Sequence, residues 1–375
     1  MRPHRPSWVR SPISNSRRGS GLQPDPTVRK VLIYRLGGLS DTVLALPCFH
    51  LIARMFPRAE RVLLTNFAVH SKAPAAALVL GDSDLVHRYM RHTEGTGRVD
   101  QLLSLAWKIR RFRAELLVYL MPPRPIKSIR RDQQFFRLAG VRRIVGLPGE
   151  RELKHSFDAA TGLYESEAFR LARTMAPIGD AHAEDLANWD PRLTAAERNT
   201  AMYALTRVHG RRLIACAPCT KVQANDWEPE NWRALLSRLS GKYPAHVLVM
   251  AGGREDAATC DYVAGAWAGD KLNLAGILSP RESVAVFAHA DIFIGPDAAP
   301  KHLAACMGIP SVCVFSARDL PGVGFPPGDR NQILYHQPEC SGCGLDTCTV
   351  MEKKCIRSVS VDEVEKAVDR VLSGV

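Results

Sequence analysis

The chain has 375 residues, of which 46% are hydrophobic and 23% are charged, and its formal net charge is +12 at pH 7. This length suits two domains, and this composition excludes an intrinsically disordered chain. No apolar run approaches the ~18 residues that a membrane-spanning helix needs. Residues 1–28 are basic and lack an apolar core. They are predicted to be a disordered tail rather than a secretory signal, and the expected compartment is the cytoplasm.

The first half of the chain alternates short apolar strands with helical stretches. Strands are predicted over 31–36, 61–65, 116–121 and 142–147. Helices are predicted over 40–56, 72–80 and 100–113, with Ser40 as the N-cap of the first. Residues 165–210 are predicted to form helices and a linker.

At residue 212 the alternation begins again. Strands are predicted over 212–218, 246–252, 272–276, 291–295 and 311–315, and helices over 229–243, 254–268, 280–290, 300–307 and 361–372. Two such series predict an α/β fold with two Rossmann-like domains and an interdomain cleft. The predicted divisions are the tail (1–28), a first domain (29–190), a linker (191–210), a second domain (211–358) and a C-terminal helix (359–375).

The positive charge is confined to the first half of the chain. Residues 1–190 contain 30 Lys and Arg against 18 Asp and Glu, whereas residues 191–375 contain 20 of each kind. The segment 101–154 alone holds 13 basic and four acidic residues. This asymmetry indicates an anionic partner, which is a nucleic acid, a membrane surface or an acidic substrate.

The turn after the first predicted strand reads RLGGLSD and contains Gly37, Gly38 and Asp41. It is similar to a phosphate loop but lacks both the G-x-G-x-x-G pattern and the G-K-[ST] ending. A carboxylate at this position is a candidate general base when a substrate hydroxyl lies within hydrogen-bonding reach.

A second candidate site follows the strand 291–295. The helix that begins there offers unpaired backbone amides and the positive end of its dipole, which suit a pyrophosphate. Ala298 and Ala299 allow a close backbone approach, and His302 lies one turn into the helix. Asp297 is a candidate either for capping this helix or for binding ligand hydroxyls.

Two neighbouring loops add polar candidates. Glu255 follows the strand 246–252, where acidic residues bind ribose hydroxyls. Thr220 and Lys221 follow the strand 212–218 and are candidates for contacting phosphate oxygens.

Four cysteines lie close together near the C-terminus: Cys340, Cys343, Cys348 and Cys355. The spacing of the first pair is typical of zinc sites, but that of the second pair is not. A reduced loop with packed or redox-sensitive thiols is the favoured interpretation, and a bound metal is the alternative.

Two of these segments, VLIYRLGGLSDTVLALPCFHLIARMFP (31–57) and IFIGPDAAPKHLAACMGIPSVCVFSARD (292–319), carry a family resemblance. They resemble the ADP-heptose:lipopolysaccharide heptosyltransferases of glycosyltransferase family 9. The second segment resembles the donor-site signature of that family in register, through its Asp, Pro, His-Leu-Ala-Ala and Gly-x-Pro positions. The resemblance covers about residues 30–370, and the cysteine cluster also recurs in members of the family.

The resemblance implies a GT-B fold and metal-independent, inverting sugar transfer without a cofactor. Asp41 would be the general base, and Asp297, the backbone of Ala298 and Ala299, and His302 would bind the donor, with Glu255 at the nucleoside. The donor would be ADP-heptose or a related nucleotide-sugar. The acceptor would be an anionic glycolipid or oligosaccharide, received at the inner-membrane surface by the first domain. Its candidate contacts are Gly37, Gly38, Arg124, Lys127, Arg130 and Arg131.

The chain departs from the family pattern at three places. The usual Ser-Gly is Ala298-Ala299, the Lys before the tryptophan is Asn225 with Lys221 as a candidate substitute, and a Gly is Ser40. Two alternatives therefore stay open, namely a nucleotide-sugar epimerase on the same fold and a catalytically degenerate nucleotide-binding homologue. Nucleic acid is not expected as a partner, because the basic segment lacks a binding motif and interleaved aromatic residues.

Overall fold

The computed structural model describes residues 23–67, 74–92 and 99–374. The chain divides into two compact units, residues 1–192 (unit 1) and residues 193–375 (unit 2). Most of the predicted tail, up to residue 22, lies outside the described residues. Within the described ranges, no helix is long and apolar enough to cross a membrane.

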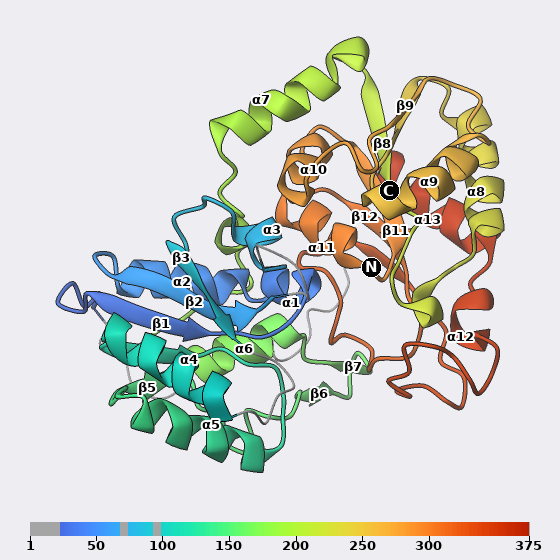
Figure 1. Cartoon of the computed structure of the whole chain (residues 1–375). Helices are drawn as coiled ribbons and strands as arrows, with labels where there is room; N and C mark the ends of the chain where they lie inside the picture. The colour runs from blue at the N-terminus through green and yellow to red at the C-terminus, as the bar shows by residue number, and fades with distance from the viewer. Residues whose placement is uncertain (1–22, 68–73, 93–98, 375) are drawn as a thin grey trace. The chain divides into compact units, whose positions relative to one another are not determined.

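Unit 1 is built on a five-stranded parallel sheet with the strand order β3-β2-β1-β4-β5 (Figure 1). Its strands are β1 (Lys30–Tyr34), β2 (Glu60–Asn66), β3 (Arg88–His92), β4 (Leu116–Tyr119) and β5 (Ile144–Val145), and a separate hairpin is formed by β6 (Phe157–Asp158) and β7 (Leu163–Tyr164). Its helices are α1 (Leu39–Leu44), α2 (Leu46–Met55), α3 (Ala77–Leu80), α4 (Val99–Phe112), α5 (Ile126–Leu138), α6 (Glu167–Met175) and the 3-10 helix η1 (Leu186–Trp189).

Alternating strand residues build the core of unit 1. Leu32 and Tyr34 of β1 point to one face of the sheet and pack against α4 and α5, together with Leu117 and Tyr119 of β4. These two helices lie side by side and bury one stripe of each helix. The opposite faces of both helices are therefore directed away from this core.

Unit 2 repeats the design with a six-stranded parallel sheet in the order β10-β9-β8-β11-β12-β13. Its strands are β8 (Arg212–Cys216), β9 (His246–Met250), β10 (Lys271–Asn273), β11 (Ile292–Pro296), β12 (Ser311–Val314) and β13 (Gln332–Leu334). Its helices are α7 (Ala195–Ala204), η2 (Thr206–Val208), η3 (Gln223–Asn225), α8 (Pro229–Lys242), η4 (Arg254–Asp256), α9 (Ala257–Ala264), α10 (Pro280–Phe287), α11 (Ala299–Cys306), α12 (Lys354–Arg357) and α13 (Val361–Leu372).

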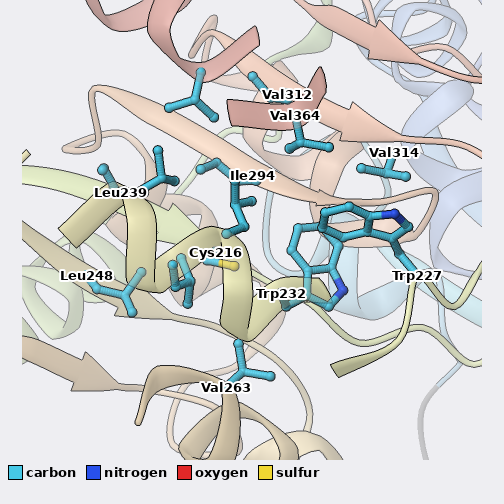
Figure 2. Close-up of a cluster of buried hydrophobic side chains, with 14 of the residues drawn as sticks. Cys216, Trp227, Trp232, Leu239, Leu248, Val263, Ile294, Val312, Val314 and Val364 are labelled. Carbon is cyan, nitrogen blue, oxygen red and sulfur yellow. The ribbon is translucent and has the colours of Figure 1, made fainter. Parts of the chain in front are cut away.

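One face of this second sheet packs against α8, α9 and α13. Figure 2 shows the core there, where Trp227 and Trp232 meet edge to face with their ring centroids 4.7 Å apart. The indole N–H of Trp227 donates to the carbonyl of Val359, which fixes the segment leading into α13. The C-terminal helix is therefore part of the unit 2 core.

Most long elements follow the sequence predictions, but α5 was not predicted, and only Ala77–Leu80 of the described part of the predicted helix 72–80 is helical. Ser40 is not the N-cap of the first helix: α1 begins after Gly38, and a break at Ala45 separates it from α2. The segment 193–210, predicted as linker, belongs to unit 2 and contains α7. The side chain of Thr194 caps this helix by accepting a hydrogen bond from the amide of Glu197. Strands β3 and β13 were not predicted, because each is short, lies at a sheet edge and lacks a buried apolar run.

The strand orders locate the places where a ligand can bind. In unit 1 the order reverses between β1 and β4, and in unit 2 it reverses between β8 and β11. In parallel α/β sheets, ligands bind beyond the carboxyl ends of the strands at this reversal. Most candidate residues of both units follow these strands, and Glu255 follows the neighbouring β9.

Candidate functional site

In unit 1, Asp41 lies in the first turn of α1, directly after β1. Its Oδ2 atom accepts the backbone amide of Gly38 at 2.7 Å, and its side chain is 43% exposed. The amide of Gly37 donates to the Oδ1 atom of Asn66 at 2.8 Å. The structure thus brings the three predicted residues of this loop together, and the second carboxylate oxygen, Oδ1, lies 3.9 Å from the guanidinium of Arg35.

Arg35, which the sequence analysis did not identify, holds this loop in place through hydrogen bonds. Its buried guanidinium donates to the carbonyl of Leu120 at 3.2 Å and to the carbonyl of Asp41 at 2.6 Å. Leu120 follows β4, so Arg35 joins the carboxyl ends of the two strands at the reversal. Burial lowers the pKa of Arg35, with the neighbouring carboxylates of Asp41 and Glu167 opposing that effect.

A buried ion-pair network continues from Arg35 to α6. The Glu167 carboxylate lies 3.9 Å from the Arg35 guanidinium and accepts Nε–H of Arg170 at 2.6 Å. Two buried guanidinium groups therefore share one carboxylate, which satisfies charges that would otherwise be costly to bury. The only signal for this network in the sequence was a charged residue inside the apolar run VLIYRL.

The predicted acceptor contacts follow β4. Arg124 donates to the Oδ2 atom of Asp132 at 2.9 Å, and Tyr119 donates to the same oxygen at 2.9 Å. Arg131 lies 3.8 Å from the other oxygen of Asp132, and its side chain is exposed. Lys127 and Arg130 are exposed on α5. Part of the predicted positive charge is therefore already paired with Asp132, and the remainder lies along the surface of α5.

In unit 2, Asp297 lies between β11 and the N-cap of α11, which is Ala298. The Asp297 carboxylate does not cap this helix. Its Oδ1 atom accepts a hydrogen bond from the ammonium of Lys301 at 2.5 Å. This pair is nearly enclosed, with Lys301 2% and Asp297 14% exposed. Of the two roles considered for Asp297, capping of α11 is therefore wrong.

Lys301 also contacts the predicted His302. The ammonium lies 2.8 Å from Nε2 of His302 and 4.7 Å from the ring centre of Phe315. His302 is buried, and burial together with the charge of Lys301 holds its pKa well below the usual range. A neutral imidazole here orients Lys301, which in turn holds Asp297.

Asn225, which replaces a lysine of the family pattern, has a clear structural role. Its side-chain amide donates to the carbonyl of Asp297 at 2.9 Å, and its oxygen accepts the hydroxyl of Ser316 at 2.5 Å. The loop after β8 is thereby joined to the loops after β11 and β12. Asn225 ties the carboxyl ends of the unit 2 strands together, as Arg35 does in unit 1.

The polar residues of the neighbouring loops also meet. The ammonium of Lys221 lies 3.1 Å from the carboxylate of Glu255, and both side chains are mostly exposed, at 88% and 60%. The pKa of Glu255 is lowered first by its own backbone amide and then by Lys221. The hydroxyl of Thr220 accepts the amide of Val222 at 3.2 Å. The loops after β8 and β9 thus present one cation and one carboxylate side by side.

A small hollow borders Asp297 and was not predicted. Its wall includes the aromatic rings of Phe315, Phe325 and Tyr335 together with Asp319. The rings of Phe315 and Phe325 pack edge to face, with centroids 5.0 Å apart. Burial raises the pKa of Asp319. The carboxylate of Asp297 therefore lies beside a hollow with aromatic walls.

The four clustered cysteines are free thiols with different surroundings. The amide of Lys353 donates to Sγ of Cys348 at 3.2 Å, and backbone amides of Met351, Lys353 and Val350 lower the pKa of this thiol. Cys343 is exposed, and burial raises the pKa of Cys340. Across the residues that the structure describes, no group of three or more Cys, His, Asp or Glu side chains is arranged to hold a metal ion.

Two units with parallel sheets, each with charged side chains at the carboxyl ends of its strands, define an α/β class of protein whose ligand sites lie at those strand ends. The family model of glycosyltransferase family 9 (heptosyltransferase) matches residues 166–354, which is half of the chain. The chain therefore belongs to glycosyltransferase family 9, and the family resemblance is confirmed.

The chain is similar to one curated relative and to two solved structures. Lipopolysaccharide heptosyltransferase 3 of Escherichia coli is 28% identical over 127 residues, and the match spans 34% of this chain but only 37% of that relative. The crystal structure of the glycosyl transferase family 9 from Veillonella parvula DSM 2008 superposes with a TM-score of 0.70 at 12% identity, covering 92% of this chain and 98% of the other. The E. coli ADP-heptose lps heptosyltransferase II superposes with a TM-score of 0.63 at 14% identity, covering 92% and 99%.

At these identities the two superpositions establish the fold alone. They confirm the predicted α/β architecture of two parallel-sheet units of the GT-B type. The predicted cleft between the units and the assignment of individual site residues stay predictions.

Proposed function

We propose that the protein is an inverting, metal-independent glycosyltransferase. It moves a heptose or a related sugar from an ADP-activated donor to an anionic lipopolysaccharide-type or polysaccharide acceptor. Membership of glycosyltransferase family 9 supports the class of reaction. The E. coli relative and the solved E. coli structure, by their names, support heptose as the sugar and lipopolysaccharide as the acceptor.

The observation that carries this proposal is the contrast between the two strand-end aspartates. The side chain of Asp41 is 43% exposed and lies 3.9 Å from the guanidinium of Arg35, whereas Asp297 is 14% exposed and lies 2.5 Å from a buried ammonium. Proton transfer needs a carboxylate that a substrate hydroxyl can reach, and a long, partly exposed ion pair leaves the carboxylate freer to take a proton than a short, buried one. Asp41 therefore fits the chemical step, and Asp297 fits the positioning of the donor.

In the proposed reaction the Asp41 carboxylate takes the proton of an acceptor hydroxyl. The hydroxyl oxygen attacks the anomeric carbon of the donor sugar, and the bond from that carbon to the diphosphate oxygen breaks in the same displacement. Attack opposite the leaving group inverts the anomeric configuration. The first turn of α11 and the exposed ammonium of Lys221 stabilise the charge of the released diphosphate.

Donor binding in this proposal uses the loops after β8, β9 and β11. The backbone of Ala298 and Ala299 faces the diphosphate, with Thr220 and Lys221 on the phosphate oxygens and Glu255 on the ribose. A bound diphosphate would separate Lys221 from Glu255, because each would exchange its partner for the ligand. Asp297 and the buried Lys301–His302 pair hold the start of α11 in place.

The acceptor in this proposal is bound by unit 1. Gly37 and Gly38 allow its sugar to approach Asp41, and Arg124, Lys127, Arg130 and Arg131 contact its negative groups. An acceptor anchored in lipid would place the reaction at the cytoplasmic face of the inner membrane, with the protein in peripheral contact.

A donor screen followed by an activity assay tests the proposal. A thermal-shift series with ADP-, GDP-, UDP- and dTDP-sugars should single out the ADP-sugar, because ligand at ~100 times its dissociation constant adds about 2.7 kcal/mol of stability. Purified protein with ADP-heptose and heptose-deficient lipopolysaccharide should then release ADP only when the acceptor is present, and EDTA should not slow it. Nuclear magnetic resonance of the product should show the inverted anomer.

Three results would contradict the proposal. Donor conversion without acceptor would indicate a nucleotide-sugar epimerase. ADP-heptose binding without turnover on any lipopolysaccharide-type or polysaccharide acceptor would indicate a catalytically degenerate homologue. A product that retains the anomeric configuration would exclude the single displacement.

A further inference from the structure

Helix α4 of unit 1 exposes a row of large apolar side chains. Val99 is 68%, Leu102 44%, Leu103 65% and Trp107 60% exposed. Val99, Leu103 and Trp107 are spaced four residues apart, so they lie along one side of the helix, with Leu102 beside them. We call these four residues the α4 apolar row.

The α4 apolar row is not needed to hold the helix on the sheet. Leu105, Ile109 and Phe112 of the same helix form its buried stripe and pack into the unit 1 core. A surface helix of a globular protein usually carries one apolar stripe and a polar opposite face. A second apolar stripe directed to solvent is typical of a surface that binds a partner or a membrane.

Positive charge lies beside the α4 apolar row, at the C-terminal end of α4 and on the neighbouring α5. The exposed basic residues of α4 and the turn that follows it are Lys108, Arg110, Arg111 and Arg113. The Arg111 guanidinium lies over the Trp107 indole, 5.4 Å from the ring centre. The adjacent helix α5 adds Lys127, Arg130, Arg131 and Arg137, and residues 99–143 contain 11 basic and only three acidic residues.

We propose that the α4 apolar row, together with the basic residues of α4 and α5 beside it, docks the protein onto an anionic lipid surface. A helix with leucine and tryptophan on one side and Lys and Arg beside them inserts its apolar side at the headgroup boundary. The cations meanwhile approach acidic headgroups. The inference rests on the proposed function for one point only, which is that a lipid-anchored acceptor makes such docking useful.

The charge distribution favours a membrane over a second copy of the chain. Two copies meeting through α4 would bring two strongly basic surfaces together, and like charges repel. An anionic bilayer instead offers opposite charge around an apolar interior. The same surface continues onto α5, where the predicted acceptor contacts lie, so docking would bring the acceptor's lipid anchor toward those residues.

Vesicle binding tests this inference with a matched pair of variants. Leu103→Glu changes the row, and Ile277→Glu makes the same charge change at a similarly exposed residue (68%) of unit 2. Wild type and Ile277→Glu should co-sediment with phosphatidylglycerol vesicles and be released by salt. Leu103→Glu should bind at least about tenfold more weakly, a difference of ~1.4 kcal/mol. Phosphatidylcholine vesicles should bind all three proteins weakly.

Tryptophan fluorescence gives a second, direct readout. Among the described tryptophans Trp107 is exposed, whereas Trp189, Trp227, Trp232 and Trp267 are buried. In a Trp8→Phe background, brominated lipids should quench Trp107 and shift its emission to the blue. Binding of ADP-heptose, followed by thermal shift, should be the same in Leu103→Glu and wild type, which separates failure of docking from failure of the proposed function.

Three outcomes would overturn the inference. The first is equal vesicle binding by Leu103→Glu and wild type. The second is equal binding to phosphatidylglycerol and phosphatidylcholine. The third is a dimer in solution that Leu103→Glu converts to monomer, since that result would assign the row to self-association.

Discussion

Asp41 and Asp297 occupy corresponding places in the two units but differ in exposure and in the distance to the nearest cation. Each follows a strand at the reversal of its sheet, and each lies at the beginning of a helix. Asp41 accepts one backbone amide, is 43% exposed and lies 3.9 Å from Arg35, whereas Asp297 is 14% exposed and lies 2.5 Å from a buried lysine. We infer that the same position in the fold can supply either a reactive carboxylate or a rigid support, and that the exposure of the carboxylate and its distance from the neighbouring cation decide which.

The two units also reinforce this position in comparable ways. Arg35 joins the loops after β1 and β4, and Asn225 joins the loops after β8 and β11. In both cases a side chain from one strand end binds a backbone carbonyl beyond the neighbouring strand. The two aspartates thus differ in their surroundings although both strand ends are held by the same kind of hydrogen bond, and substitutions can test that difference.

The largest effect on stability is expected for Lys301→Met. This variant leaves the Asp297 carboxylate nearly buried without its cation, so the free energy of unfolding should fall by about 3–5 kcal/mol. Urea denaturation followed by the fluorescence of the buried Trp227 and Trp232 measures the change in unit 2. The double variant Asp297→Asn with Lys301→Met should recover most of the loss, because both partners are then uncharged. A loss below about 1 kcal/mol would show that the pair is not enclosed.

In the loop that contains Asp41, the variant Gly37→Ala should strongly reduce the rate of sugar transfer. Gly37 has φ of +147°, and an added Cβ would lie 2.7 Å from Cβ of Asp41, so the carboxylate must move. A displacement of about 1 Å can cost roughly a hundredfold in rate. Steady-state kinetics of ADP release measures this.

Gly38→Ala is the matched control for Gly37→Ala. Gly38 has φ of −89°, and the nearest atom to its added Cβ is Oδ2 of Asp41 at 3.7 Å. It should transfer far faster than Gly37→Ala. Equal rates in the two variants would contradict the importance of the Asp41 position.

A smaller effect, visible as a pH dependence, is expected from His302. Its folded pKa is held well below the usual 6.5 by burial and by Lys301. Between these two values the unfolded chain binds one more proton, so stability is lost as the pH falls below 6.5, at up to about 1.4 kcal/mol per pH unit. His302→Gln should lack this part of the slope when denaturation is compared from pH 7 to pH 5. Parallel slopes would show that His302 is accessible to protons.

The smallest stability change is expected for Lys221→Met. Its pair with Glu255 is exposed, and such pairs contribute about 0–1 kcal/mol. The same denaturation assay should therefore separate Lys221→Met clearly from Lys301→Met. Affinity for ADP-heptose should nevertheless fall about tenfold, as for the loss of one hydrogen bond to a charged group. Unchanged affinity would remove Lys221 from the donor site.

The fold was predictable wherever a buried apolar run marks an element. The central strands β1, β4, β8 and β11 carry such runs, and their positions and parallel arrangement follow from them. The edge strand β3 reads RYMRH and is only partly buried, so its pairing depends on β2 rather than on its own pattern. Local sequence does not contain that information.

The candidate site was predictable in its positions but not in its charge pairing. Asp41 and Asp297 were identified from their places after strands. A lysine in the first turn of a helix usually lies in solvent, so nothing local indicated that Lys301 is buried against Asp297. Arg35 was likewise hidden in an apolar run. Which charged residues are buried, and with which partners, is determined by the packing of distant segments.

The measurement that tests the central claim most directly compares Asp41→Asn with Asp297→Asn in the same transfer assay. The Asp41→Asn variant should lose about a hundredfold to ten-thousandfold in turnover, the usual contribution of a general base, while its dissociation constant for ADP-heptose stays within about twofold of wild type. The Asp297→Asn variant should show the reverse pattern, with weakened donor binding and a smaller loss of turnover. Near-normal turnover in Asp41→Asn, or equal losses of the same kind in both variants, would contradict the division of roles between the two aspartates.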